Sequence, residues 1–291
     1  RRRRRPLHRF AVPLPIVDGE ETVSFTIQVH AAVADIGREA WEACAAPSGD
    51  PFVSFDFLDA CEASGSAAPR EGWAGRHLSL SDGDGRVLGV MPLWLKGHSQ
   101  GEYVFDHSWA DAYERAGGRY YPKLLGAVPF TPVTGPRFLH RPGADAAAVR
   151  AALLQGAREL VDRLGLSSLH VNFPTRPEWE AMGEAGLLLR EDLQYVWRNQ
   201  GYGNFDDFLA ALSSSRRKTV RRERREAQAG LDIRVLTGAG IEETHWDAFF
   251  ACYMDTGSRK WGRPYLTRAF FTRIGATMAE RIALVMAFRD G

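Results

Sequence analysis

The sequence contains few cysteines and no long apolar run. Among its 291 residues are three cysteines, Cys44, Cys61 and Cys252, which are widely spaced and follow neither a metal-ligand nor a disulfide pattern. We therefore expect reduced thiols in a cytoplasmic protein, with Cys61 and Cys252 buried on apolar helix faces. No apolar stretch approaches the roughly 20 residues that a transmembrane helix needs, so we predict no transmembrane segment.

Several catalytic signatures are also missing. No Gly-x-Ser-x-Gly nucleophile motif is present, and no Gly-x-Gly-x-x-Gly motif follows a predicted strand. The eight histidines are scattered without the spacing of metal ligands, so we predict no metal and no tightly bound cofactor. These absences favour direct transfer between two bound substrates over covalent catalysis, a reaction that mainly requires positioning and a base.

The net charge of +1 conceals an asymmetry along the chain. Residues 196–291 carry 16 Lys and Arg against 11 Asp and Glu, whereas residues 10–195 carry 15 against 25. The chain begins with RRRRRPLHRF, and an apolar stretch broken by proline follows, too short for a signal peptide. We interpret residues 1–24 as a flexible basic tail or an over-extended reading frame, and we give them no functional weight.

Hydrophobic periodicity predicts an α/β (α+β) chain of two domains, 25–197 and 198–291. In the first domain, strands at 76–81 and 86–95 flank Asp82-Gly83-Asp84-Gly85, a strong hairpin signal. Helices are predicted at 37–45, 52–64, 145–164 and 177–184, and further strands at 22–35, 134–139, 168–173 and 187–197.

The second domain begins with a long helix at 205–229, interrupted near 213–215. A strand at 231–236, helices at 243–255 and 267–278 and a strand at 281–288 follow. The stretches RHLSLSDGDG and RIALVMAFRDG are alike, and helices precede each of them. We infer an internal duplication whose second copy is incomplete at the C-terminus.

Residues 101–139 form an aromatic segment without a continuous helical or alternating pattern. Its nine rings are Tyr103, Phe105, His107, Trp109, Tyr113, Tyr120, Tyr121, Phe130 and Phe138. Disordered segments are poor in aromatic residues, so we predict an ordered loop that builds a site. The alternative is that the rings close the end of a hydrophobic core. Asp106, His107 and Asp111 are the best acid–base candidates in this segment.

A basic helix at 213–230 contains seven cationic residues and only two acidic ones. Cations in the first turn oppose the helix dipole, so a polyanion such as CoA phosphates, a pyrophosphate-linked lipid precursor or an RNA backbone is a natural partner. Two alternatives stay open, a solvated helix face and a match to the acidic first domain.

Long blocks of the sequence carry a family resemblance. They are PFVSFDFLDACEASGS (51–66), GEYVFDHSWADAYERAGGRYYPKLLGAVPFTPVTGPRFL (101–139), SLHVNFPT (168–175), FDDFLAALSSSRRKTVRRERREAQAGL (205–231) and HWDAFFACYMDTGSRKWGRPYL (245–266). The sequence resembles FemAB-like peptidoglycan biosynthesis/recognition proteins of the GNAT (acyl-CoA N-acyltransferase) superfamily. The resemblance implies tandem GNAT-like mixed-sheet domains, with acyl-CoA or aminoacyl-tRNA as co-substrate.

We therefore expect an acyl- or aminoacyl-transferase that acts on an amino group, possibly of a peptidoglycan precursor. The alternative is a non-catalytic recognition module that binds a cell-wall precursor or RNA. Asp106, His107 and Asp111 would handle protons or orient the amine. The expected substrate-lining residues are Tyr113, Arg119, Tyr120, Tyr121 and Lys123, with Lys260 and Trp261 at the rim. The expected phosphate-binding residues are Arg217, Lys218, Arg221 and Arg222.

Overall fold

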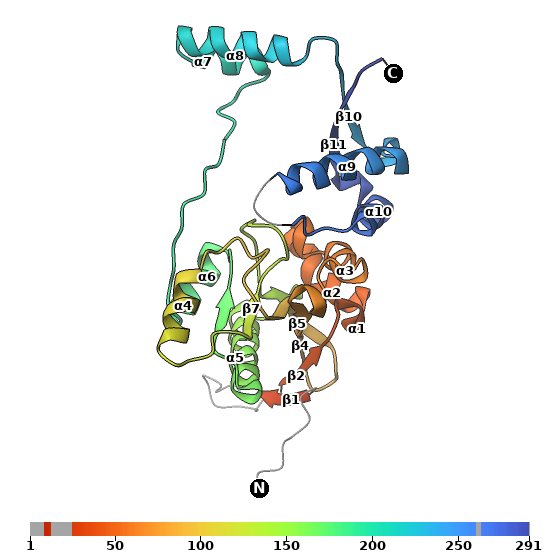
Figure 1. Cartoon of the computed structure of the whole chain (residues 1–291). Coiled ribbons are helices and arrows are strands. Elements are labelled where there is room, and N and C mark those ends of the chain that lie inside the picture. Colours follow the sequence, from red (N-terminus) through yellow and green to blue (C-terminus); the bar gives the residue numbers. More distant parts are fainter. Residues whose placement is uncertain (1–8, 13–24, 260–262, 291) are drawn as a thin grey trace. The chain divides into compact units, whose positions relative to one another are not determined.

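The computed structural model describes residues 9–12, 25–259 and 263–290, and it divides into two compact units (Figure 1). Unit 1 comprises Arg1–Leu187 and Glu243–Met278, and unit 2 comprises Leu188–Glu242 and Ala279–Gly291. The division predicted from the sequence, between residues 197 and 198, differs from this one because residues 243–278 belong to unit 1. Helices and strands mix in both units, which confirms the predicted α+β class.

Unit 1 contains an antiparallel sheet with strand order β1-β2-β4-β5-β8. These strands are β1 (Arg9–Val12), β2 (Phe25–His30), β4 (His77–Ser81), β5 (Val87–Met91) and β8 (Leu139–His140). Residues 9–12, predicted as part of a flexible tail, therefore form a strand, because they pair with β2. Helix α5 (Ala146–Leu164) packs its apolar side against β4 and β5 and forms the main hydrophobic core with them. The Asp145 carboxylate caps the start of α5 and Gly165 ends the helix in the left-handed conformation, so the helix predicted at 145–164 is confirmed.

A second sheet in unit 1 has the strand order β3-β6-β7-β9. Its strands are β3 (Trp73–Gly75), β6 (Leu93–Lys96), β7 (Lys123–Gly126) and β9 (Leu169–Val171), and only the β7–β9 pair among them is parallel. The predicted strand 86–95 is therefore two strands in two sheets. Pro92 separates them, and proline cannot donate a hydrogen bond to a strand ladder.

The aromatic segment is more regular than predicted. It contains α4 (His107–Arg115) and β7, and the strand expected at 134–139 is reduced to β8. Helix α6 (Arg176–Glu184) follows β9 as predicted. Arg137 is buried beside it, and its backbone N–H donates to the Glu178 carboxylate of α6 at 2.9 Å.

Further helices complete the described part of unit 1. They are α1 (Val33–Ile36), α2 (Arg38–Ala45), α3 (Phe55–Ala63), α9 (Glu243–Ser258) and α10 (Arg268–Thr277). Helix α10 contacts α3, and the Thr267 N–H donates to the Ser66 hydroxyl at 3.0 Å. Cys61 on α3 is buried as predicted, whereas the prediction for Cys252 is wrong because it lies on the exposed side of α9.

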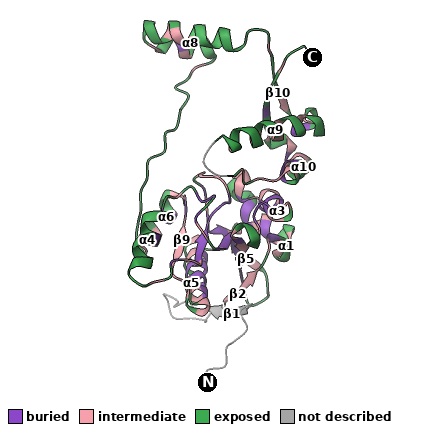
Figure 2. Cartoon of the chain, viewed as in Figure 1, coloured by how far each residue is buried: buried purple, intermediate pink, exposed green. Residues whose placement is uncertain are grey.

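Unit 2 contains α7 (Phe205–Ala211), α8 (Ser214–Ala227) and the antiparallel strands β10 (Asp232–Thr237) and β11 (Ala283–Phe288). The predicted break in the long helix is confirmed. The predicted strand 187–197 is wrong, because residues 187–200 find no partner strand in the described chain and several of their apolar side chains are exposed. Figure 2 shows the contrast between the buried core of unit 1 and the exposed α8.

The interpretation of the two predicted domains as a tandem repeat stays a prediction. None of the helices in the described ranges is long and apolar enough to span a bilayer.

Candidate functional site

Two buried lysines lie opposite each other on neighbouring strands of the second sheet. Lys96 ends β6, Lys123 begins β7, and the two are direct register partners. Side chains at such positions extend from the same face of a sheet. Both side chains are fully buried (0% exposed), which is rare for lysine unless a partner compensates for its charge.

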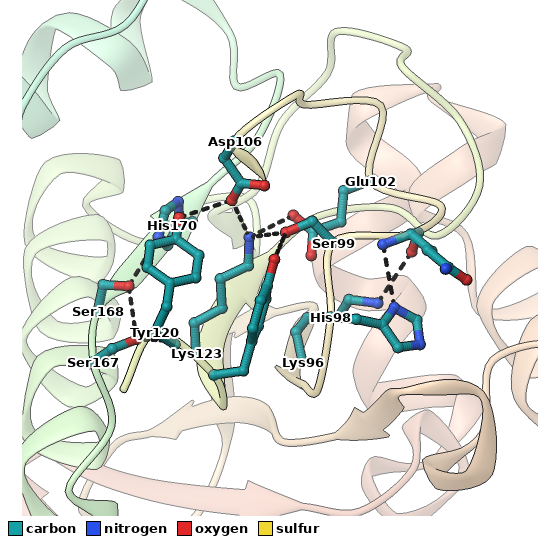
Figure 3. A network of polar contacts seen from close by, with 12 residues as sticks. Lys96, His98, Ser99, Glu102, Asp106, Tyr120, Lys123, Ser167, Ser168 and His170 are labelled. Carbon is teal, nitrogen blue, oxygen red and sulfur yellow. Dashed lines mark hydrogen bonds and ion pairs between the residues drawn. The ribbon is translucent and has the colours of Figure 1, made fainter. Parts of the chain in front are cut away.

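Lys123 binds three side chains of the connection between β6 and α4 (Figure 3). Its Nζ donates to Ser99 Oγ at 2.8 Å, to Glu102 Oε2 at 2.9 Å and to Asp106 Oδ2 at 2.6 Å. One ammonium group thus saturates its three donors and fastens residues 97–106 to the sheet. We call Lys96, Ser99, Glu102, Asp106 and Lys123 the buried lysine cluster.

Asp106 lies at the N-cap position of α4, but its carboxylate does not cap the helix. It faces the sheet instead, where it accepts hydrogen bonds from Lys123 and from Tyr120 Oη at 2.8 Å. Burial by itself would raise the pKa of Asp106, yet the hydrogen bonds from Lys123, Ser99 and Tyr120 outweigh it and lower the pKa to about 2. Asp106 is therefore a weak base that holds the start of α4 in position.

Lys96 is held less firmly than Lys123. Its Nζ lies 3.5 Å from the centroid of the Trp73 ring and donates to the Gln100 carbonyl at 3.3 Å. Burial lowers the pKa of Lys96 to about 7, although the charge of Glu102 acts in the opposite direction. Burial also raises the pKa of Glu102 in spite of Lys123. Lys96 can therefore gain or lose a proton near neutral pH.

Two carboxylate oxygens of the buried lysine cluster, Glu102 Oε1 and Asp106 Oδ1, have no hydrogen-bond partner among the described residues. A group of buried ionisable side chains with shifted pKa values and unpaired oxygens is typical of a functional site. Asp106 and Lys123 were predicted from the sequence as site residues, whereas Lys96, Ser99 and Glu102 were not. One sequence feature could have indicated Lys96: a lysine stands at one end of each of two short apolar strands, Lys96 in β6 and Lys123 in β7.

Apart from the buried Tyr120, the other predicted residues of the aromatic segment lie on the surface or at its edge. His107 and Asp111 are exposed on α4, so the acid–base triplet does not gather around one point. Arg119 is exposed, Tyr120 is buried, and Tyr121 is half-buried with its hydroxyl 2.8 Å from Ser99 Oγ. Lys260 and Trp261 lie outside the described residues.

The basic helix α8 uses one predicted phosphate ligand for its own structure. The Arg217 guanidinium donates to the carbonyls of Leu209 and Ala210 at 2.9 Å and of Leu212 at 3.0 Å, and so caps the end of α7. Lys218 is exposed, Arg221 lies 3.7 Å from Asp206, and Arg222 lies 3.9 Å from Glu226.

A cavity of about 680 Å³ lies between α7 and α8. Arg224 covers the aromatic residue of its lining, with the guanidinium carbon 3.9 Å from the Phe205 ring centroid. The residues that line the cavity are Asn204, Phe205, Asp206, Asp207, Leu209, Arg221, Arg224, Arg225 and Gln228. Of the four predicted phosphate ligands only Arg221 is among them, whereas Arg217, Lys218 and Arg222 are not.

Comparison with known proteins gives one family. The FemAB-like family model, described as peptidoglycan biosynthesis/recognition, matches residues 32–291. No curated protein matches the chain. Because the family model covers most of the sequence, including both units, the chain belongs to the FemAB-like family of peptidoglycan biosynthesis and recognition.

Proposed function

We propose that the protein is an N-acyltransferase that moves an acyl or aminoacyl group onto an amino group of a peptidoglycan precursor. The observation that carries this proposal is the family match over residues 32–291. The buried lysine cluster supports it, because it gives the aromatic segment the fixed geometry that direct transfer between two bound substrates requires.

In this reaction the substrate amine attacks the carbonyl carbon of the donor. A C–N bond forms, the bond from that carbon to the sulfur of CoA or the ribose oxygen of tRNA breaks, and the amine proton passes to a base while the leaving group takes up a proton. Asp106 is too weak a base for this step, since its pKa is about 2. We assign the proton to His107, which is exposed at the first position of α4 directly after the residue held by Lys123.

The donor in both classes carries phosphates, and α8 offers cations for them. Lys218, Arg221 and Arg222 are exposed on this helix, and the pairs that the two arginines make with acidic side chains are long, at 3.7 and 3.9 Å. Such exposed pairs contribute little and are easily exchanged for a phosphate. We leave Arg217 out of this set because its guanidinium caps α7.

A test compares the full chain with His107→Ala and, as a matched control, with Ser108→Ala at the next exposed position of α4. Each is incubated with a muropeptide amine and either acetyl-CoA or charged tRNA, and mass spectrometry measures the acylated product. We expect His107→Ala to lower turnover by about 100-fold or more with unchanged unfolding, and Ser108→Ala to retain it. Unchanged turnover in His107→Ala would remove the assigned base.

A second candidate function is recognition without catalysis. It is favoured by one observation: Oδ2 of Asp106, the most deeply buried of the predicted acid–base residues, is already bound by both Lys123 and Tyr120. In that case the wild-type protein binds the precursor but gives no product with either donor.

A further inference from the structure

The chain uses lysine sparingly and buries it. Of its 37 Lys and Arg residues only four are lysines, and two of these, Lys96 and Lys123, have fully buried side chains. An arginine keeps its charge throughout the pH range of living cells, whereas a buried lysine can lose its proton. The chain therefore places a cation that can be neutralised where burial disfavours charge.

The two buried lysines differ in how well their charge is compensated. Lys123 is bound by two carboxylates, whereas Lys96 Nζ donates to the Gln100 carbonyl at 3.3 Å and faces the Trp73 ring at 3.5 Å. Burial lowers the pKa of Lys96 to about 7, while the charge of Glu102 raises this pKa and the charge of Lys123 lowers it. Lys96 is thus the member of the cluster whose charge changes near neutral pH.

Residues 97–101 (GHSQG) contact both buried lysines directly after the end of β6 (Figure 3). The Gln100 carbonyl accepts a hydrogen bond from Lys96, and Ser99 Oγ accepts one from Lys123 at 2.8 Å. We call residues 97–101 the lysine lid. Because Lys96 ends β6 and Lys123 begins β7, the lid can leave the ends of these strands without breaking the sheet between them.

The backbone of the lysine lid is held weakly. It contains neither helix nor strand, the Gly97 N–H donates to the Gly72 carbonyl at 3.3 Å, and the Gly101 carbonyl accepts from the Phe130 N–H at 3.2 Å. Both ends of the lid are glycines, and Gly101 adopts a left-handed conformation with φ of 78°. Segments with few backbone hydrogen bonds open at a lower free-energy cost than the core, and glycine accommodates the change in dihedral angles.

His98 is a second ionisable group in the lid. Its ring lies on Gly72, where an added Cβ would come within 2.3 Å of Nε2, and its Nδ1 accepts a hydrogen bond from the Gln100 N–H at 3.2 Å. Burial lowers the pKa of His98, and the charge of Lys96 lowers it further. Both groups therefore hold their protons less tightly with the lid closed than they would in water.

The direction of the pH effect follows from this difference. A conformation in which water reaches Lys96 and His98 binds their protons more tightly than the closed one does, so a falling pH shifts the population towards it. We propose that the lysine lid is a pH-sensitive switch: protons on Lys96 and His98 lift it from the ends of β6 and β7. Lifting removes Ser99 from Lys123 and thereby loosens the support of Asp106, the residue directly before α4.

The first measurement follows the proton on Lys96. The full chain is labelled with 13C at the lysine Cε atoms, which gives only four signals, and the signal that Lys96→Met removes is assigned to Lys96. We expect this signal to titrate near pH 7.

Hydrogen exchange then measures opening of the lid, with rates corrected for the intrinsic effect of pH. The amides of Gly97, Gln100 and Glu102 should lose up to about 100-fold in protection between pH 9 and pH 6, which is the change that a pKa of about 7 against an ordinary 10.5 allows. Lys96→Met should remove most of this change, whereas Lys218→Met, at an exposed lysine of α8, should keep it. The amides of α5 should stay at least about tenfold better protected at each pH, because the core remains closed.

Four results would each overturn the proposal. A Lys96 signal that titrates only above pH 9 would show that the closed lid does not weaken its hold on the proton. Equal protection of the lid at pH 9 and pH 6 would show that the proton does not move the lid, and an unchanged pH dependence in Lys96→Met would assign the effect to another group. Equal protection of the lid and of α5 at each pH would assign the effect to unfolding of unit 1 as a whole.

Discussion

Replacing Lys123 by methionine removes the central cation of the buried lysine cluster while nearly preserving its volume. The side chain is 0% exposed and bonds to Ser99, Glu102 and Asp106, so the change leaves two buried carboxylates without their common partner. Loss of one partner from a buried ion pair typically costs about 3–5 kcal/mol of unfolding free energy. We expect a loss of that size at pH 7.

The pH dependence of stability gives a second, independent estimate, namely the contribution of the ionised Asp106 to the unfolding free energy. The pKa of Asp106 is about 2, compared with an ordinary value of 3.8. At about 1.36 kcal/mol for each tenfold change in proton affinity, this carboxylate contributes roughly 2 kcal/mol of stability. Because its pKa is lowered in the folded state, that contribution is present above about pH 4 and is lost as the pH falls towards 2.

In Lys123→Met the shift of the Asp106 pKa should reverse its direction. Burial is the largest influence on Asp106, and without Lys123 it raises the pKa of this carboxyl instead of being outweighed. Protonation then relieves the buried charge, so the stability gap between variant and wild type narrows as the pH is lowered from 7 to 4. The double variant Lys123→Met/Asp106→Asn should recover part of the loss at pH 7.

Urea unfolding followed by tryptophan fluorescence measures these differences, since Trp73 and Trp94 are buried in the same unit as the cluster. Lys218→Met, at an exposed lysine of α8, is the control and should change stability by less than about 0.5 kcal/mol. Wild-type stability of Lys123→Met at pH 7 would show that Lys123 does not compensate the two buried carboxylates. A difference in unfolding free energy between variant and wild type that grows as the pH is lowered would show the same.

Two further predictions follow from ionised groups. Lys96→Met should be more stable than the wild type by up to about 5 kcal/mol at pH 6, because the pKa of Lys96 is about 7 in the folded protein against an ordinary 10.5. Between these two pH values the unfolded wild-type chain binds a proton that the folded chain does not, so wild-type stability rises with pH over that range. The difference in unfolding free energy between variant and wild type should therefore shrink by pH 10, and urea titrations at pH 6 and pH 10 would measure it. An equal gap at both pH values would contradict this. Arg217→Ala should destabilise α7 by about 1–2 kcal/mol through the loss of three carbonyl contacts. Hydrogen exchange of the α7 amides measures it, and they should exchange faster than in Lys218→Ala; equal protection would show that the cap is dispensable.

Local sequence signals predicted much of the secondary structure. Ser54 accepts a hydrogen bond from the Phe57 N–H at the start of α3, and Asp145 caps α5, because a cap is decided by residues two or three positions away. The β4–β5 hairpin is confirmed for the same reason, since Asp82 lies in its connecting turn. Where a partner strand was needed, as at 187–197, the sequence was misleading, because a stretch rich in apolar residues forms a strand only beside another strand.

The candidate site was only partly accessible from the sequence. Aromatic composition pointed to residues 101–139, and the structure brings two of the residues predicted there, Asp106 and Lys123, into direct contact. Lys96 was missed because its pairing with Lys123 depends on a register between strands that are 27 positions apart. The role of Arg217 was also missed, since its charge suggested a phosphate ligand while its geometry makes it a helix cap.

The sequence by itself determined the helices with strong caps and the central hairpin, because these depend on neighbouring residues. It also determined the family, because the resemblance extends over long stretches of the chain. Only the tertiary structure decided which charges are buried, which carboxylates share Lys123, and that the pKa of Lys96 falls to about 7. The physical reason is that the proton affinity of an ionisable group is fixed by desolvation and by the charges within a few ångströms of it, and those neighbours come from distant parts of the chain.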